Sequence, residues 1–184
     1  MRTIDAYPEL MTRWALQLLA LVFVRPGELM SARWEDVSFD DRRWINHPKK
    51  TKDIEEVIVP LSRQALEILA KVRNQSGHTP WIFPHRSDHA KHAGRGTPAL
   101  ALRRMGITDH VPHGFRAAAR TILDERLGYR FDWIEIQLGH KLVNPNGAAY
   151  ARGTHIDGRI AMMQAWADYL DKLKAEPITV RATV

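Results

Sequence analysis

The 184-residue chain is expected to form an α+β fold that is mainly helical and carries one small antiparallel β-sheet. Three observations predict this fold. Apolar residues recur at helical spacing in several segments, and three short runs typical of strands follow one another between residues 34 and 59. Apolar residues also make up 45% of the chain, which is enough for a hydrophobic core. We expect one domain at residues 1–175 and a loose tail at 176–184, where no periodicity is present.

The first half of the chain supplies two helices and the sheet. A helix over 11–24 is apolar on nearly every side, which is typical of a buried helix. It ends at Arg25-Pro26-Gly27, and a short helix follows at 28–32. The strand-like runs lie at 34–39, 43–45 and 57–59. Short turns join these runs, so we expect an antiparallel sheet whose second, polar turn carries Lys49, Lys50 and Lys52.

The second half of the chain is expected to be helical. Ser62 is a suitable N-cap for a helix at 63–73. A short apolar segment at 81–84 leads into a polar, glycine-containing loop at 85–97. Four more helices are predicted at 98–105, 114–127, 132–138 and 157–174.

Composition limits the classes of protein to which the chain can belong. The chain has no cysteine, which excludes disulfides, thiol nucleophiles and cysteine-ligated metals and suits a reducing cytoplasm. The longest apolar run, Trp14 to Val24, is too short to span a bilayer. The net charge is +6, and between Lys71 and Arg120 nine basic residues stand against two acidic ones. This stretch is either a solvated face or a surface for a polyanion such as nucleic acid.

Several polar residues are candidates for phosphate chemistry. Arg25 directly follows an apolar helix, where it can pair with Glu28 or bind a ligand. His113 and Arg116 are three residues apart, so on a helix they share one face and can hold two oxygens of one phosphate. In Leu138-Gly139-His140, a second imidazole lies at a helix end, where the simpler interpretation is a C-terminal cap.

Two further features are a tyrosine beside a turn and a histidine-rich loop. Tyr150 follows the turn at 144–147 and precedes Arg152-Gly153, which argues against a core ring. A histidine-rich cluster lies in the 85–97 loop, but its spacing matches no standard zinc pattern. The members of this cluster are His85, Asp88, His89 and His92. We therefore expect no metal site.

Taken in order, these motifs resemble the catalytic domain of the tyrosine recombinases, and most of all its phage and prophage integrase branch. The motifs are R-P-G-E-L beginning at Arg25, a lysine on a β-turn, H-G-F-R, L-G-H and a tyrosine ten residues later. The resemblance extends from about residue 7 to residue 173 and includes V-P-L-S-R-Q-A-L, A-L-R-R-M-G and M-M-Q-A-W-A-D-Y-L. It implies the fold of DNA breaking–rejoining enzymes.

The resemblance also implies a role for each candidate residue. Arg25 and Arg116 would grip the scissile phosphate, His113 and His140 would be the two signature histidines, and Tyr150 the nucleophile. The turn lysine falls on Lys52, although Lys49 and Lys50 are close by. The implied activity is site-specific DNA recombination through a 3′-phosphotyrosyl intermediate, for prophage or genomic-island integration and excision, without a cofactor. The expected catalytic set is Arg25, Lys52, His113, Arg116, His140 and Tyr150.

Partners and alternatives follow from the same resemblance. It implies double-stranded DNA attachment sites, a homotetramer on DNA, host or phage DNA-bending proteins as accessory factors, and a nucleoid-associated, cytoplasmic location. The N-terminal DNA-binding domains of the family are expected to be absent from this chain. The alternatives are relaxation of DNA by a type IB topoisomerase and a non-catalytic DNA-binding remnant. Whether the last helix packs on its own domain or on a neighbouring protomer stays open.

Overall fold

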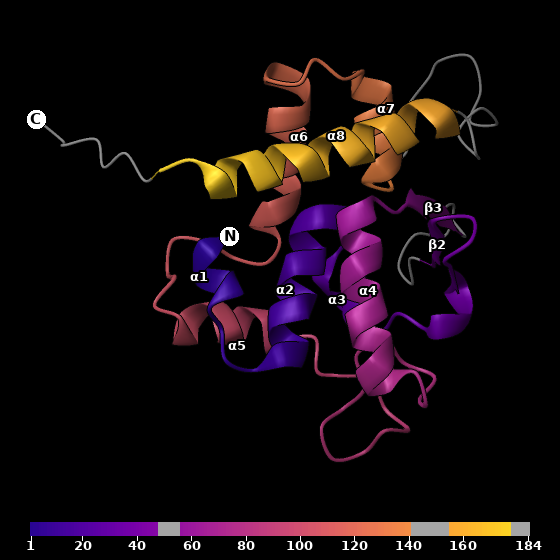
Figure 1. The fold of residues 1–184 in the computed structure, drawn as a ribbon, viewed down its shortest axis with the longest axis vertical. Coiled ribbons are helices and arrows are strands. Elements are labelled where there is room, and N and C mark those ends of the chain that lie inside the picture. Colours follow the sequence, from indigo (N-terminus) through magenta and orange to yellow (C-terminus); the bar gives the residue numbers. More distant parts are fainter. Residues whose placement is uncertain (48–55, 141–154, 178–184) are drawn as a thin grey trace, which may run out of the picture.

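The computed structural model describes residues 1–47, 56–140 and 155–177. Helices dominate these residues, and the helix α2 (Leu10–Val22) lies at their centre (Figure 1). The helices α4 (Arg63–Ser76), α5 (Thr97–Arg104), α6 (Gly114–Glu125) and α8 (Ile156–Ala175) all pack against α2. The prediction of a mainly helical fold with one small sheet is confirmed.

The apolar sequence of α2 explains its central place. From Ala15 to Val22 every side chain except that of Gln17 is buried, and Leu16, Leu18 and Leu19 are each at most 1% exposed. The Glu9 carboxylate caps the first turn by accepting a hydrogen bond from Thr12 N at 3.0 Å. The helix ends at Phe23, whose backbone is left-handed with φ 38°. A four-residue helix, α1 (Arg2–Asp5), precedes α2 and was not predicted, because one turn is too short to show periodicity.

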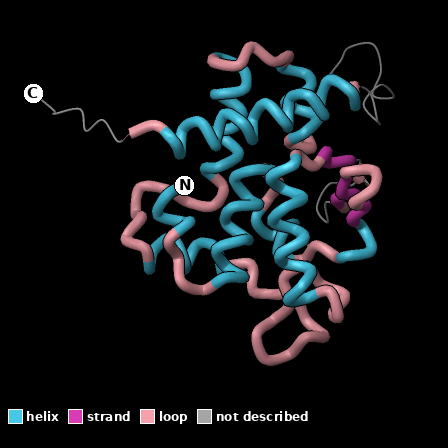
Figure 2. The backbone as a smooth tube through the Cα atoms, in the orientation of Figure 1, coloured by secondary structure: helices cyan, strands magenta, loops and turns pink. Residues whose placement is uncertain are grey.

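The sheet has three strands in the order β1-β2-β3, and both pairs are antiparallel. The strands are β1 (Val37–Ser38), β2 (Arg43–Asn46) and β3 (Val57–Pro60), and a 3-10 turn, η1 (Trp34–Asp36), precedes them. Trp44 lies opposite Val59, and both are buried in the core. Figure 2 shows the strands gathered at one edge of the molecule. The predicted three-stranded sheet is confirmed, but residues 34–36 of its first predicted run form the 3-10 turn and not part of a strand. The lysine-bearing turn lies outside the described residues.

The remaining helices begin and end within a few residues of the predicted bounds. Ser62 caps α4 by accepting a hydrogen bond from Ala65 N at 3.3 Å, as predicted. The short helix α7 (Phe131–Gln137) matches its predicted segment within one residue. The helix α3 (Pro26–Met30) begins two residues before the predicted start, because Pro26 is suited to the first turn of a helix and does not break it. The helix α8 lies across the ends of α2 and α4 (Figure 1). The 85–97 loop folds back on itself, since His85 N donates to Lys91 O at 2.8 Å. No helix of the described residues is long and apolar enough to cross a membrane.

Candidate active site

Arg116 lies at the centre of the candidate site, one turn into α6, and only 4% of it is exposed. Its Nη1 donates to Phe23 O at 2.8 Å, and its Nη2 donates to Leu138 O at 2.7 Å. These carbonyls belong to the C-cap residues of α2 and α7, where no further helical N–H is available to bind them. Arg116 therefore joins the ends of two helices to the start of a third.

The burial of Arg116 changes its electrostatics but not its charge at neutral pH. Burial, and then the nearby positive charge of Arg25, lower the pKa of Arg116 to about 10. The guanidinium stays cationic and poorly hydrated in this position. A cation in that state interacts strongly with an anion because little water screens it.

His113 is the N-cap residue of α6, three residues before Arg116. Its pKa is lowered by partial burial and by the positive charges of Arg116, Arg25 and His140. His113 and Arg116 thus stand three residues apart at one helix end, and Arg116, Arg25 and His140 lie close enough for their charges to act on the His113 imidazole. A histidine with a lowered pKa is neutral near pH 7, which is the form able to accept a proton.

Arg25 pairs with Glu28, one of the two possibilities that its place in the sequence allows. Its Nη1 donates to Glu28 Oε1 at 2.8 Å, and its backbone N donates to Glu28 Oε2 at 3.0 Å. The side chain is nevertheless 36% exposed, and a guanidinium has five N–H donors. The same Nη1 lies 3.9 Å from the position that a Cβ on Gly139 would take. Pairing with Glu28 therefore fixes Arg25 beside the 138–140 turn and leaves donors for a ligand.

His140 reaches the site through the turn that ends α7. His140 N donates to Glu135 O and Gly139 N donates to Ile136 O, both at 3.0 Å, which is the hydrogen-bond pattern of a Schellman cap. Gly139 has φ 66°, a left-handed conformation that glycine adopts without strain. The L-G-H motif is thus a helix cap, and the cap brings His140 Nε2 to 3.4 Å from Arg116 Nη2.

Sequence reasoning missed one residue at this site. The Glu135 carboxylate is 2.7 Å from His140 Nδ1 through Oε2 and accepts a hydrogen bond from Arg120 Nε at 2.6 Å through Oε1. Burial raises the pKa of Glu135, but the hydrogen bonds from Arg120 and His140 outweigh it and hold that pKa below its usual range. The available signal was an acidic residue within the apolar sequence W-I-E-I-Q, five positions before His140.

Lys52 and Tyr150 lie outside the described residues, as do Lys49 and Lys50, and their roles stay predictions. The strand ends that flank residues 48–55 do border the site. Asn46 Nδ2 donates to Glu28 Oε2 at 3.0 Å, and Val57 Cγ2 lies 3.3 Å from the position of a Cβ on Gly139. The described parts of the chain thus connect the sheet to Arg25 and to the turn before His140.

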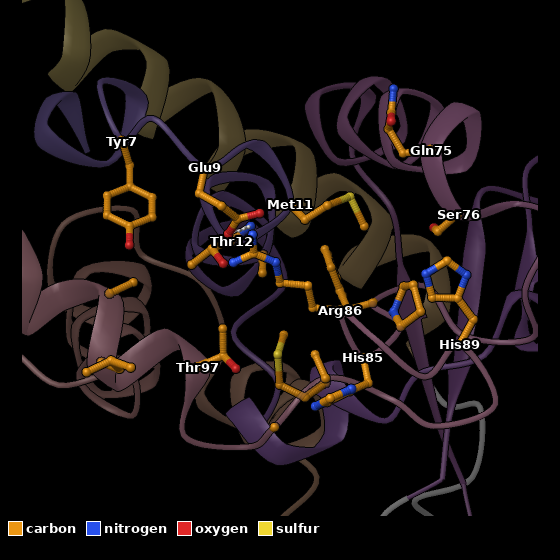
Figure 3. Close-up of a pocket in the computed structure, with 18 of the residues that line it drawn as sticks. Tyr7, Glu9, Met11, Thr12, Gln75, Ser76, His85, Arg86, His89 and Thr97 are labelled. Atoms are coloured by element: carbon orange, nitrogen blue, oxygen red, sulfur yellow. Dashed lines mark hydrogen bonds between the residues drawn. The ribbon is translucent and has the colours of Figure 1, made fainter.

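Metal clusters and cavities are the other features that could bind a ligand. Among the described residues, no group of three or more histidine and acidic side chains is arranged to hold a metal ion. A cavity of about 720 Å³ lies between the start of α2, α5 and the loop that follows Phe83. Figure 3 shows Tyr7, Glu9 and Arg86 around it. Of the predicted site residues that the structure describes, Arg25, His113, Arg116 and His140, none lines this cavity.

Comparison with known proteins identifies the family. The model of the phage integrase family matches residues 2–155, and the chain belongs to that family. It is 42% identical over 178 residues to the integrase of Enterobacteria phage P4, an alignment that covers 88% of this chain and 40% of that protein. The chain spans less than half the length of the curated relatives that it matches.

Solved structures show the same fold. The integrase from mycobacterium phage Brujita superposes with a TM-score of 0.67 and 18% identity, covering 99% of this chain and 57% of that chain. A lambda integrase tetramer bound to a Holliday junction gives a TM-score of 0.58 and 19% identity, covering 76% of this chain and 43% of that chain. The fold is therefore that of tyrosine recombinase catalytic cores. The integrase relatives do not favour the topoisomerase alternative.

Proposed function

We propose that this chain is the catalytic domain of a site-specific DNA recombinase that cuts and rejoins DNA at phage or genomic-island attachment sites. One observation carries the proposal. Four predicted side chains, Arg25, His113, Arg116 and His140, come from three different helix ends, and the charges of the other three act on His113 while Arg116 contacts His140. Two guanidinium and two imidazole groups this close together are suited to bind a phosphodiester.

The proposed reaction is transesterification. The Tyr150 oxygen attacks the scissile phosphorus, forms a 3′-phosphotyrosyl bond and displaces the 5′-oxygen of the next nucleotide. Attack by a second 5′-hydroxyl reverses the step, so the energy of the broken bond is stored and no nucleotide cofactor is needed. Negative charge grows on the two non-bridging oxygens in the transition state, where Arg25, Arg116 and His140 donate hydrogen bonds.

Proton transfers accompany both halves of the reaction. A phenol has a pKa of about 10, so Tyr150 must lose its proton as it attacks. His113 accepts this proton, which is consistent with its lowered pKa. Lys52 donates a proton to the departing 5′-oxygen, a role that suits lysine because its ammonium can lose a proton. The cationic side chains take the part that metal ions have in many nucleases, so we infer a metal-independent reaction.

The partners follow from the same proposal. Double-stranded DNA is the substrate, and the excess of basic residues between Lys71 and Arg120 favours its binding. We infer a tetramer on DNA, since the lambda integrase whose fold this chain shares was solved as a tetramer on a Holliday junction. Accessory DNA-bending proteins and a nucleoid location belong to this proposal, and we place the domain at residues 1–175.

A suicide substrate tests the proposal directly. The protein is incubated with nicked attachment-site DNA, and the covalent adduct is measured on a denaturing gel in the presence of EDTA. We expect an adduct with the wild-type chain and none with Tyr150→Phe, which should still bind DNA. An adduct that persists in Tyr150→Phe would exclude Tyr150 as the nucleophile, and an adduct that disappears with EDTA would exclude the metal-independent reaction.

A further inference from the structure

The Glu135 carboxylate lies behind His140, on the side of the imidazole away from Arg116. Glu135 Oε2 is 2.7 Å from His140 Nδ1, and His140 Nε2 is 3.4 Å from Arg116 Nη2. The two ring nitrogens therefore meet two different partners, a carboxylate and a guanidinium. The contacts assign one proton position for the neutral ring, because an ionised carboxylate only accepts hydrogen bonds and a guanidinium only donates them.

We propose that Glu135 is a positioning residue of the recombination site, which holds the proton of His140 on Nδ1 and directs Nε2 towards the scissile phosphate. The inference rests on the proposed function. With Nδ1–H donating to Glu135, Nε2 is the nitrogen that faces Arg116 and the phosphate position. When the ring takes up a second proton, that proton is on Nε2, and His140 then donates to a phosphate oxygen while Glu135 balances its charge.

The carboxylate is itself held in place from the other side. Arg120 Nε donates to Glu135 Oε1 at 2.6 Å, and the Arg120 guanidinium lies 4.9 Å from the centre of the Phe131 ring. Arg120 is four residues after Arg116 on α6, so both arginines project from one face of that helix. α6 thus contacts His140 directly through Arg116 and indirectly through Arg120 and Glu135.

The burial of Glu135 supports a specific role. Its side chain is only 11% exposed, and a buried carboxylate is unfavourable unless hydrogen bonds compensate it. Both oxygens are bound, and the pKa of Glu135 lies below its usual range because these bonds outweigh burial. Glu135 is therefore ionised at neutral pH and accepts at both oxygens.

The variant Glu135→Gln changes one oxygen into an amide nitrogen without changing the shape. Arg120 Nε can only donate, so it binds the amide oxygen, and the amide NH2 then faces His140 Nδ1. Nδ1 must become the acceptor, which moves the ring proton to Nε2, where it meets the donating Arg116. By analogy with carboxylates that orient metal-bound histidines, we expect cleavage to fall by about 10- to 100-fold.

Nitrogen-15 NMR of the histidine side chains tests the proton position at a pH where the ring is neutral. We expect the wild-type chain to show His140 with the proton on Nδ1 and Glu135→Gln to show it on Nε2. His140→Ala assigns the signal. A wild-type ring with its proton on Nε2 would overturn the inference, and this measurement does not depend on the variant folding. A proton that stays on Nδ1 in folded Glu135→Gln would overturn it as well.

Cleavage of the suicide substrate tests the effect on the reaction. When Glu135→Gln is added to His140→Ala, cleavage should fall no further, because Glu135 acts through His140. If Glu135→Gln lowers cleavage equally in the wild-type chain and in His140→Ala, the inference is overturned. Glu67→Gln is the matched control, since Glu67 also pairs with an arginine but is 53% exposed, and we expect wild-type cleavage. If the wild-type chain forms no adduct, the proposed function fails, whereas the NMR result still stands for the Glu135–His140 contact.

Discussion

Arg116→Lys keeps the positive charge at the centre of the site but removes the planar arrangement of two donor nitrogens. In the wild-type chain, two nitrogens of one planar group bind Phe23 O and Leu138 O at 2.8 and 2.7 Å. A lysine has a single nitrogen at the end of a flexible chain, and its ammonium is more strongly hydrated than a guanidinium. It therefore cannot hold both helix ends and also present a fixed pair of donors to a phosphate.

The size of the effect follows from these contacts. Loss of one charged hydrogen bond to a buried carbonyl costs about 1.5–3 kcal/mol, so the free energy of unfolding should fall by about that amount. Loss of a well-placed donor to the transition state costs about 100- to 1,000-fold in rate. Since Arg116 has both roles, we expect cleavage to fall more than the loss of stability alone would explain.

Urea unfolding and suicide-substrate cleavage measure the two effects separately. The matched control is Arg63→Lys. The Arg63 side chain is 61% exposed, and Glu67 is its one salt-bridge partner among the described residues. We expect both properties of that control to stay near wild type. Wild-type cleavage by Arg116→Lys would refute the reasoning, because it would show that a point charge is sufficient at this position.

Two further predictions concern pH and packing. Burial and the charges of Arg116, Arg25 and His140 lower the pKa of His113, so this imidazole binds a proton more readily in the unfolded chain than in the folded one. The contribution of His113 to stability is therefore present above about pH 6.5 and is lost as the pH falls. Urea unfolding over a pH series should show a smaller fall for His113→Gln than for the wild-type chain, and equal falls would contradict the prediction. In Gly158→Ala, the added methyl group would overlap the Trp133 ring, so we expect unfolding to become easier by about 1–3 kcal/mol. In the control Gly96→Ala, nothing lies within 4 Å of the added carbon, and a stability loss equal to that of Gly158→Ala would exclude the overlap as the cause.

Local patterns in the sequence predicted most of the fold. The apolar run of α2, the Ser62 cap and the strand runs at 43–45 and 57–59 depend on neighbouring residues, and the structure confirms each of them. The run at 34–39 is a strand only at Val37–Ser38, since Trp34–Asp36 form a 3-10 turn. The helix α1 was missed because one helical turn carries no periodic signal. Helix bounds differ by a few residues because the ends depend on packing with other segments.

The sequence by itself determined which arginines and histidines are available for a phosphate site. It predicted that the motifs H-G-F-R and L-G-H stand at helix ends. It also predicted that His113 and Arg116 share one side, because that relation depends only on helical spacing. Tertiary structure alone decided that Arg116 binds the ends of α2 and α7, and that Glu135 connects Arg120 to His140. These contacts join residues up to 93 positions apart, and their geometry depends on how the helices pack.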